Sequence, residues 1–420
     1  MHVARPDKRR RITVAASIQD DLLIDEVVVR LPAKSLARCR CVCRSWRAGI
    51  ASAAFVRRHL ELSRQRRPLS VLSSPRGQNI DFKNVLATSE EISFHRLLLP
   101  PPGRAAPAQG VTDADLIFEK AWPGEGITYR IHPKHCDGLV AVATTTDRVF
   151  VCNPATREFV ALPLGSHNAQ FDCNKVPQVA LGFDRWRNAY VVGRCFYRKF
   201  ELDASYDIGH EVFMLGSGDG DSRWELTQDQ PYAVEGHSPM CTRQAFYWHP
   251  CAPAPEQLMR FSLQHRTFDM VSKPPAPDGF NAAFDDTTEL DGKLCYVHAV
   301  EDASFKFWLA DEMPELQWTL HCRIDLLNPI PGHCHYLTPV AIEGDALLVA
   351  IDDHKVCWYN VKSQCLEEVV DVQHNLQYRR PDGSKYMCSS PSDAYFIHVV
   401  PYIESLVPLR ASTVAPNCTF

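Results

Sequence analysis

The residues best suited to metal or nucleophilic chemistry are cysteines and histidines in three short stretches. Cys39, Cys41 and Cys43 alternate in "RCRCVC", and "HPKHC" (132–136) and "HCH" (333–335) bring His and Cys together. A structural zinc site needs four such ligands, usually as two spaced pairs. The chain contains no CxxC pair, and none of the three stretches has a second half at zinc-site spacing. We therefore expect neither a metal nor another cofactor.

Motifs that would support catalysis are missing as well. "GSGDGD" (216–221) is the only glycine-rich stretch, and no Lys-Ser or Lys-Thr follows it, as a phosphate-binding loop requires. The sequence has no GxSxG elbow and no HExxH helix, and no Cys and His are identifiable as a catalytic couple. We expect no catalytic residues, and hence a protein that is not an enzyme.

Charge divides the chain into two parts. Residues 1–67 hold 16 Lys and Arg and 6 Asp and Glu, a net of +10, whereas the remainder holds 29 basic and 44 acidic residues, a net of −15. A basic head on an acidic body indicates two modules with different partners. No segment has the length and hydrophobicity of a signal peptide or a membrane span. We expect a protein of the cytoplasm or nucleus that does not bind membranes, with its 16 cysteines mostly reduced.

Apolar residues in the basic part recur at helical spacing over three segments. These are Leu22–Leu31, begun by Asp20 and Asp21, then Leu36–Ile50, capped by Ser35, and finally the segment from Ser52, its cap, to Leu62. On a continuous second helix, Cys39 and Cys43 share a face and Cys41 points away, which argues further against a chelate. Three short helices form a small core, so a partner or an attached domain must cover their apolar faces.

Arginines lie between these apolar positions, and they favour a protein partner over nucleic acid. They are Arg38, Arg40, Arg44, Arg47, Arg57, Arg58, Arg64, Arg66 and Arg67. No Asn or Gln is placed beside them to read base edges, so we expect no binding to nucleic acid. Interleaved with apolar residues, they indicate solvated helix faces or a surface that steers an acidic protein.

The stretch from Ile18 to Leu60 resembles an F-box, the helical motif that docks on the Skp-type adaptor of a cullin–RING ubiquitin ligase. The resemblance rests on "RLPAKSL", "CVCRSWR" and the closing "F…HL". It implies that nine residues pack internally or against the adaptor: Leu22, Leu23, Val27, Leu31, Pro32, Leu36, Val42, Cys43 and Trp46. Two features depart from the family: Ile18-Gln19 replaces the common Leu-Pro, and the segment before Leu31-Pro32 is one residue longer.

The acidic part consists of short alternating apolar runs broken by Pro, Gly, Asn and Asp, which predicts an all-β domain. A strand–turn–strand pattern recurs in it, marked by Val149, Val212, Met259, Phe305 and Val356 at steps of 63, 47, 46 and 51 residues. That period is close to the length of a propeller blade. We expect a β-propeller of about six blades, with a β-sandwich as the alternative.

This part resembles the F-box-associated domains of plant proteins, which are kelch-like propellers. The phrases "CDGLVAVA", "VCNPATREFVALP", "LGFDRWRNAYVVGRCFY" and "TELDGKLCYVH" occur in the order found in that family. Asn153-Pro154 with Thr156 also predicts a hairpin turn, because Pro sets φ and Asn and Thr bond to nearby backbone. The expected division is a disordered basic tail (1–17), the F-box (18–62), a linker (63–70), the propeller (71–372) and a segment partly packed on it (373–420), with "AYFIHVVPYIESLV" as a closing strand or helix.

Together the two resemblances imply the non-catalytic target-recognition subunit of an SCF ubiquitin ligase. Its partners would be the Skp-type adaptor, through it the cullin and RING subunits, and a target protein whose binding residues are unknown. The exposed loops 165–173, 247–257 and 328–339 are candidates for target contact. Two alternatives stay open: a scaffold or decoy whose degenerate F-box no longer recruits a ligase, and a propeller-type oxidoreductase with a copper site of Tyr, His and Cys.

Overall fold

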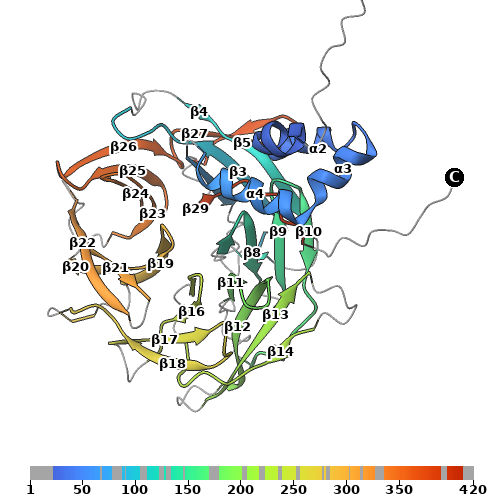
Figure 1. Ribbon diagram of the computed structural model, residues 1–420. Coiled ribbons are helices and arrows are strands. Elements are labelled where there is room, and N and C mark those ends of the chain that lie inside the picture. The colour runs from blue at the N-terminus through green and yellow to red at the C-terminus, as the bar shows by residue number, and fades with distance from the viewer. Residues whose placement is uncertain are drawn as a thin grey trace, which may run out of the picture.

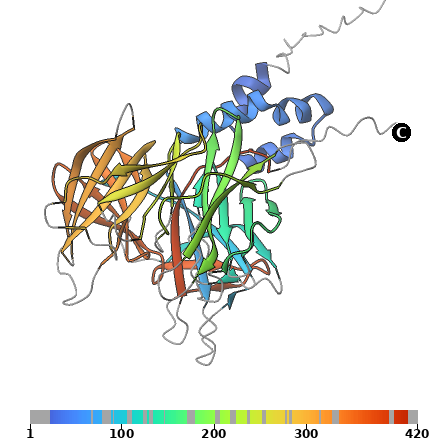
Figure 2. The ribbon, with the colours of Figure 1, turned by 90° about the horizontal axis from the view of Figure 1, so that it is seen from below.

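A helical unit at the start of the chain lies against a ring of β-sheets (Figure 1). We call residues 22–66 the head and the ring the propeller. Figure 2 shows the head at one face of that ring. The computed structural model describes residues 22–66, 69–77, 88–89, 91–104, 111–122, 127–128, 134–144, 147–169, 179–200, 206–216, 223–234, 239–251, 256–276, 279–280, 284–301, 303–312, 316–326, 335–388 and 395–409.

Five short helical elements build the head. They are η1 (Leu23–Val27, a π-helix), η2 (Val28–Arg30, a 3₁₀-helix), α2 (Ala33–Cys39), α3 (Arg44–Ala51) and α4 (Ala53–Arg64). Their apolar sides meet in one small core of Ile24, Val28, Val29, Leu36, Ile50 and Phe55. The expected helical unit is confirmed.

The π-helix accounts for the extra residue before Leu31-Pro32. The backbone N–H of Val28 points to the carbonyl of Leu23, five residues back, as well as to that of Ile24. A π-turn holds one residue more than an α-turn, so it takes up an insertion without moving the residues that follow. The expected starting residues Ile18 to Asp21 lie outside the described residues.

The predicted continuous helix from Leu36 to Ile50 is wrong. α2 ends at Cys39 and α3 begins at Arg44, with Cys43 between them in an extended conformation (φ −157°, ψ 174°). The apolar spacing runs through the break because residues on both sides pack on the same core, so periodicity could not reveal it. Cys39 and Cys43 therefore share no helical face.

Of the two helix caps predicted at Ser35 and Ser52, one is wrong and one is confirmed. Ser35 lies inside α2, whose N-cap is Pro32, so the predicted Ser35 cap is wrong. Ser52 is the N-cap of α4 as expected, and its hydroxyl oxygen accepts the N–H of Phe55 at 3.2 Å. That bond satisfies one of the N–H groups that a helix start leaves without an intrahelical partner.

Six four-stranded antiparallel sheets form the blades of the propeller. From the innermost strand outward, blade 1 holds β29 (Tyr395–Tyr402), β1 (Ser70–Gly77), β3 (Glu91–Leu98) and β5 (Asp115–Ala121), and blade 2 holds β7 (Lys134–Cys136), β8 (Leu139–Ala143), β9 (Val149–Asn153) and β10 (Glu158–Ala161). In the same order, blade 3 holds β11 (Val179–Asp184), β12 (Ala189–Phe200), β13 (Tyr206–Leu215) and β14 (Glu225–Leu226), and blade 4 holds β15 (Met240–Cys241), β16 (Ala245–Trp248), β17 (Gln257–Ser262) and β18 (Phe268–Ser272). Blade 5 holds β19 (Asp286–Leu290), β20 (Lys293–Glu301), β21 (Ser304–Asp311) and β22 (Gln317–Asp325), and blade 6 holds β23 (Leu337–Glu343), β24 (Ala346–Ile351), β25 (Lys355–Asn360) and β26 (Cys365–Asp371). Six blades are confirmed for the described residues, and the β-sandwich alternative is wrong.

The ring is closed through the innermost strands. β29, β7, β11, β15, β19 and β23 each contact the next, and β23 contacts β29 again. The strands of blades 2 to 6 run outward in chain order, so their turns between first and second strands and between third and fourth strands all emerge on one face. We call it the head-side face, because the head contacts it at blade 2, and the opposite one the far face.

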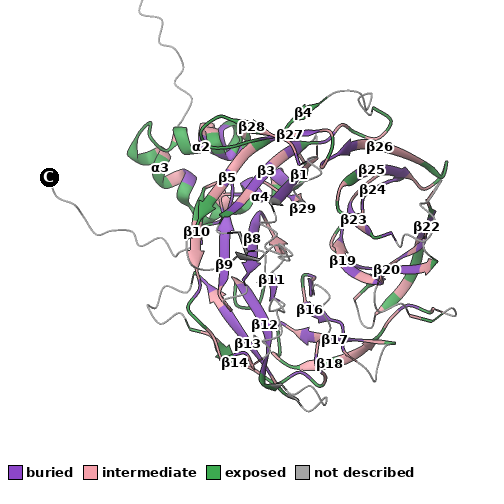
Figure 3. Ribbon diagram, turned by 180° about the vertical axis from the view of Figure 1, so that it is seen from behind, coloured by how far each residue is buried: buried purple, intermediate pink, exposed green. Residues whose placement is uncertain are grey.

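The sequence markers correspond to one structural position. Val149, Val212, Met259, Phe305 and Val356 each lie in the third strand of a blade, in β9, β13, β17, β21 and β25. The third strand lies between two other strands of its sheet, so apolar, strand-forming residues are favoured there in every blade. Figure 3 shows two of these third strands, β9 and β25, as largely buried.

Blade 1 is built from both ends of the propeller. β29 pairs with β1 over eight residues, from Ser70 opposite Tyr402 to Gly77 opposite Tyr395. This strand lies beyond residue 372, where the sequence-based division ended the propeller. Outside the blades, β2 (Thr88–Ser89) pairs with β6 (Ile127–Thr128), and β4 (Thr112–Asp113), β27 (Leu376–Arg379) and β28 (Lys385–Tyr386) form a small sheet.

Two further properties of the described residues concern membrane-spanning helices and cysteines. In the part of the chain described here, no helix is long and apolar enough to cross a membrane. The cysteines in that part are all free thiols, and Cys152, Cys195, Cys295 and Cys357 are buried in strands, where burial raises the pKa of each thiol.

Candidate adaptor-docking surface

The head presents large apolar side chains to solvent. Leu22 is 57% exposed, Val27 55% and Val42 64%. Pro32 and Cys43 are exposed too, so five of the nine residues expected to pack internally or against the adaptor lie on the surface. Exposed apolar residues gathered in so small a unit are typical of a protein-binding surface.

The other four expected residues are less accessible. Leu23, Leu31 and Trp46 are half-buried and pack against the core of the head. Leu36 is fully buried in that core. Of the two roles that the resemblance allows, Leu36 takes the internal one, so we expect its mutation to affect adaptor binding through loss of the fold.

The surface around Val42 is basic. Arg38, Arg40, Arg44 and Arg47 are exposed, and none of them forms an ion pair with any described residue. The Arg47 side chain donates from Nε to the carbonyl of Arg40 at 3.3 Å, which links α3 to the turn that carries Val42. Unpaired guanidinium groups beside an exposed apolar side chain complement an acidic protein with apolar grooves.

A buried network holds Leu31 in place beneath this surface. Nε2 of the fully buried His59 lies 3.1 Å from the carbonyl oxygen of Leu31, and Arg66 donates to the carbonyls of Arg30 (3.0 Å) and Leu31 (2.9 Å). Burial lowers the pKa of His59 to about 4. The imidazole is therefore neutral at physiological pH, and its ring can donate to the carbonyl.

Ion pairs join the head to blade 2 of the propeller and to Glu404, which follows β29. Arg64 at the end of α4 binds Asp137 at 2.6 Å, and the hydroxyl of Tyr190 donates to the same carboxylate at 3.1 Å. Arg66 pairs with Glu404 at 3.2 Å. These contacts fix the orientation of α4 on the head-side face.

The tail segment, residues 403–409, lies between head and propeller. The side-chain amide of Asn153 donates to the carbonyls of Val407 (2.9 Å) and Ser405 (3.2 Å). The N–H of Leu409 donates to Glu158 at 2.9 Å. Leu60 of α4 belongs to the same apolar cluster as Val407 and Leu409, so the segment is bound on both sides.

The sequence predicts Asn153 only as a turn residue. That role is confirmed, because Oδ1 accepts the N–H groups of Ala155 (3.0 Å) and Thr156 (3.4 Å). The expected bond of the Thr156 side chain to nearby backbone is wrong, since its buried hydroxyl has no partner among the described residues. The second role of Asn153, holding the tail segment with the other side of the amide, was missed. No local sequence pattern signals a contact 254 residues away.

The described residues contain no group of three or more His, Cys, Asp and Glu side chains that could hold a metal ion. His132, His333 and Cys334 lie outside that part of the chain, as do residues 217–221 of the glycine-rich stretch. Of the loops expected to contact a target, residues 170–173, 252–255 and 328–334 also lie outside it.

The head and the six-bladed ring define a protein that joins an adaptor-docking motif to a propeller. Residues 20–57 match the F-box domain, and residues 105–388 match the "F-box associated beta propeller domain". Since the second match spans more than half of the chain, the protein belongs to the F-box associated β-propeller family.

Relatives in Arabidopsis thaliana are similar over most of the chain. The F-box/LRR-repeat protein At2g43260 is 23% identical over 94% of this chain and 84% of its own length. The putative F-box protein At1g30930 is 26% identical over 85% of this chain and 89% of its own length. The crystal structure of the Myceliophteria thermophila Cps50 (Swd1) β-propeller domain covers 74% of this chain and 93% of its own, at 7% identity and a TM-score of 0.39, which is too low to support an argument.

Proposed function

We propose that this protein is the target-recognition subunit of an SCF-type cullin–RING ubiquitin ligase. The F-box docks on the Skp-type adaptor, and through it on the cullin and RING subunits, while the propeller holds a target protein. The observation that carries the proposal is the arrangement of the F-box. Its exposed Leu22, Val27 and Val42 and the unpaired arginines face solvent, whereas α4 is bound to the propeller.

In this role the chain contributes proximity. Ubiquitin would be transferred by the RING subunit and its conjugating enzyme, so no residue of this chain forms or breaks a covalent bond. A target held on the propeller is confined near the activated ubiquitin, which raises the effective concentration of its lysines. The gain depends on a fixed path from adaptor to target, and the bound tail segment and the Arg64–Asp137 pair support such a path.

The test measures binding of the full-length chain to a plant Skp-type adaptor. Val42→Asp places a charge in the proposed interface and should abolish or weaken binding at least tenfold, because an unpaired carboxylate would be desolvated there. Leu226→Asp is a matched control, since Leu226 is 63% exposed but lies on β14 at the outer edge of blade 3. It should bind like the wild type.

A reconstituted ubiquitination assay with the same variants completes the test. Loss of target ubiquitination in Val42→Asp alone would support the proposal. Failure of the folded wild-type chain to bind the adaptor would overturn it and would favour a scaffold or decoy.

A further inference from the structure

A polar pocket of about 340 Å³ opens on the head-side face of the propeller. Its walls come from the first turns of three neighbouring blades: Arg185 from blade 3, Arg243 and Gln244 from blade 4, and Gly292 and Lys293 from blade 5. The end of β21 completes it with Ala310, Asp311 and Glu312. The described residues of loops 165–173, 247–257 and 328–339 do not line it, because these connections leave their strands at the far-face ends.

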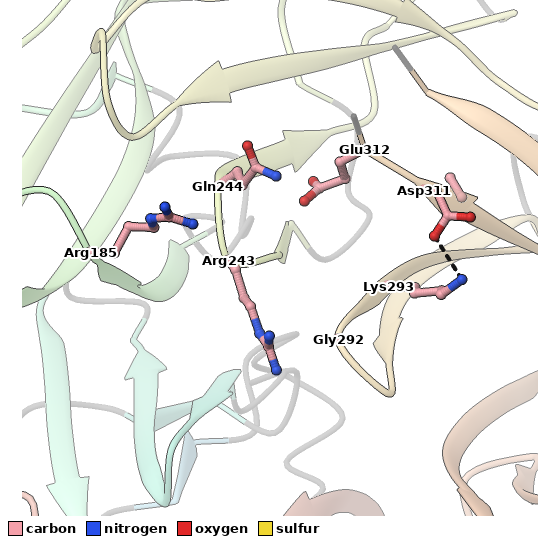
Figure 4. Close-up of a pocket in the computed structure, with 8 residues that line it drawn as sticks. Arg185, Arg243, Gln244, Gly292, Lys293, Asp311 and Glu312 are labelled. Atoms are coloured by element: carbon pink, nitrogen blue, oxygen red, sulfur yellow. Dashed lines mark ion pairs between the residues drawn. The ribbon is translucent and has the colours of Figure 1, made fainter. Parts of the chain in front are cut away.

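The acidic residues of this pocket already have partners. Asp311 pairs with Lys293 at 2.7 Å, and Figure 4 shows this pair on one side of the opening. Glu312 accepts hydrogen bonds from Thr242 (2.5 Å) and from the Tyr247 hydroxyl (2.6 Å). Behind the wall, Glu289 accepts the N–H of Gly292, and burial raises the pKa of this carboxyl. The carboxylates are thus held within the propeller.

The two arginines supply positive charge to the same opening, and that of Arg243 also acts on the buried Glu289 carboxyl, whose pKa it lowers against the effect of burial. Arg185 and Arg243 are exposed, and neither forms an ion pair with the part of the chain that the structure describes. In Figure 4 they reach into the pocket from the side opposite the Lys293–Asp311 pair. Two unpaired guanidinium groups therefore face one opening, on a domain whose sequence is acidic overall.

Arg185 has a ring contact within its own turn, and Arg243 lies beside the first turn of blade 5. Arg185 stacks on Trp186, with its guanidinium carbon 5.1 Å from the ring centroid. Asp184 fixes that turn by accepting the N–H groups of Trp186 (2.9 Å) and Arg187 (3.0 Å). Arg243 lies over Gly292, where an added Cβ would approach its guanidinium group to 3.5 Å. The ring contact of Arg185 reduces the entropy that this donor loses when it binds an anion.

We propose that this pocket is the target-recognition site and that it binds an acidic segment of the target protein. The carboxylates of that segment pair with Arg185 and Arg243, Gln244 supplies a neutral donor, and the exposed Trp186 offers an apolar contact beside them. The inference rests on the proposed function, since it names the ligand of the propeller. A phosphorylated residue presents the same anionic chemistry, and the test separates the two sources.

The site would place the target on the face that carries the F-box. Asp137 and Asn153, which hold the head and the tail segment, lie in turns of blade 2 on that face, and Arg185 lies in the next blade. A segment bound between blades 3 and 5 would therefore leave the propeller on the face that carries the F-box. The two binding events would share one side of the molecule.

The test uses the full-length chain in complex with its Skp-type adaptor and an array of short peptides in three matched sets. One set carries Asp and Glu, the second carries Asn and Gln at the same positions, and the third carries phosphoserine. We expect the Asp and Glu set to bind and the neutral set not to bind. Affinity should fall as salt is raised, because exposed charges are screened.

Charge reversal identifies the site. Arg185→Glu and Arg243→Glu should each weaken binding of the selected peptides about tenfold or more, since attraction becomes repulsion. Arg223→Glu is the matched control: Arg223 is exposed, lies before β14 outside the pocket and should not affect binding. Binding by the phosphoserine set alone, lost in the same two variants, would support the pocket and assign the anion as phosphate.

Peptide binding that is unchanged in both pocket variants would overturn this inference, and so would the absence of any preference for anionic peptides. Adaptor binding is measured on the same samples. Its loss would contradict the proposed function, whereas intact adaptor binding without anion selectivity would contradict only the pocket.

Discussion

The side-chain amide of Asn153 donates a 2.9 Å hydrogen bond to the carbonyl of Val407. This bond joins a hairpin turn of blade 2 to the tail segment. The same side chain caps its own turn through Oδ1. One fully buried residue thus serves both the local hairpin and the attachment of the F-box. The F-box is held by the propeller through this segment and through α4.

Asn153→Ala should lower the free energy of unfolding by about 2–3 kcal/mol, because it leaves buried carbonyls and turn N–H groups without partners. Asn360 is the matched control: its Oδ1 caps the equivalent turn of blade 6 for Lys362 and Ser363. Asn360→Ala should cost only about 1 kcal/mol. Urea unfolding measures both, and faster hydrogen exchange at residues 403–409 should appear in Asn153→Ala alone. Equal losses in the two variants would show that Asn153 acts only as a turn cap.

Gly138→Ala should detach the tail segment. A Cβ at Gly138 would lie 2.3 Å from the carbonyl oxygen of Ile403 and 2.8 Å from the Ser405 hydroxyl, and φ is +82°. Gly344 has φ +61° with nothing within 4 Å, so Gly344→Ala reports backbone strain alone, roughly 1–2 kcal/mol. We expect Gly138→Ala to cost at least about 1 kcal/mol more, because overpacking adds to strain. Similar thermal stabilities of the two variants would contradict the close approach.

Arg194→Met should be among the most destabilising single changes in blade 3. Arg194 is fully buried and pairs with Glu211 (2.5 Å) and Asp147 (2.8 Å), so its loss leaves a buried carboxylate uncompensated. Such a change costs about 3–5 kcal/mol.

The control for this prediction lies on the same strand. Arg198 pairs with Asp207 (3.0 Å) and Asp229 (2.7 Å) at the surface, and Arg198→Met should cost about 1 kcal/mol or less. The double variant Arg194→Met/Glu211→Leu should recover part of the loss, because the fully buried carboxylate is removed and only the partly exposed Asp147 is left without its partner. Urea unfolding gives the free energy of unfolding of the three variants. A double variant no more stable than Arg194→Met would refute the explanation by a buried, unpaired charge.

Stability should fall as the pH drops from about 6.5 to 4. Burial lowers the pKa of His59 to about 4 and that of His210 to about 3, whereas a histidine in the unfolded chain titrates near 6.5. Between these values the unfolded state binds more protons, so the free energy of unfolding rises with pH. Each histidine adds a slope approaching about 1.4 kcal/mol per pH unit.

Urea unfolding at a series of pH values measures this slope. His59→Gln and His210→Gln should each flatten it, because Gln stays neutral throughout. An unchanged slope in both variants would mean that other groups cause the acid sensitivity.

Much of the fold could be predicted from local patterns. The five markers from Val149 to Val356 each fall in a third strand, because that position requires apolar strand residues in every blade. The Ser52 cap was predictable as well, since it depends only on residues within one turn of helix. The break at Cys43 was not, because both α2 and α3 contribute apolar residues to one core and the spacing continues across the turn.

By itself the sequence determined the helical F-box and the β-propeller of about six blades, because periodicity and motifs record which side of each element is apolar. Only the tertiary structure decided that β29 completes blade 1, that the tail segment lies between α4 and Asn153, and that Arg185, Arg243 and Lys293 line one pocket. These relationships join residues far apart in the chain, and ring closure brings them together. Leu36 shows the same limit within the F-box, since its apolar character is equally consistent with the docking surface and with the core in which it is buried.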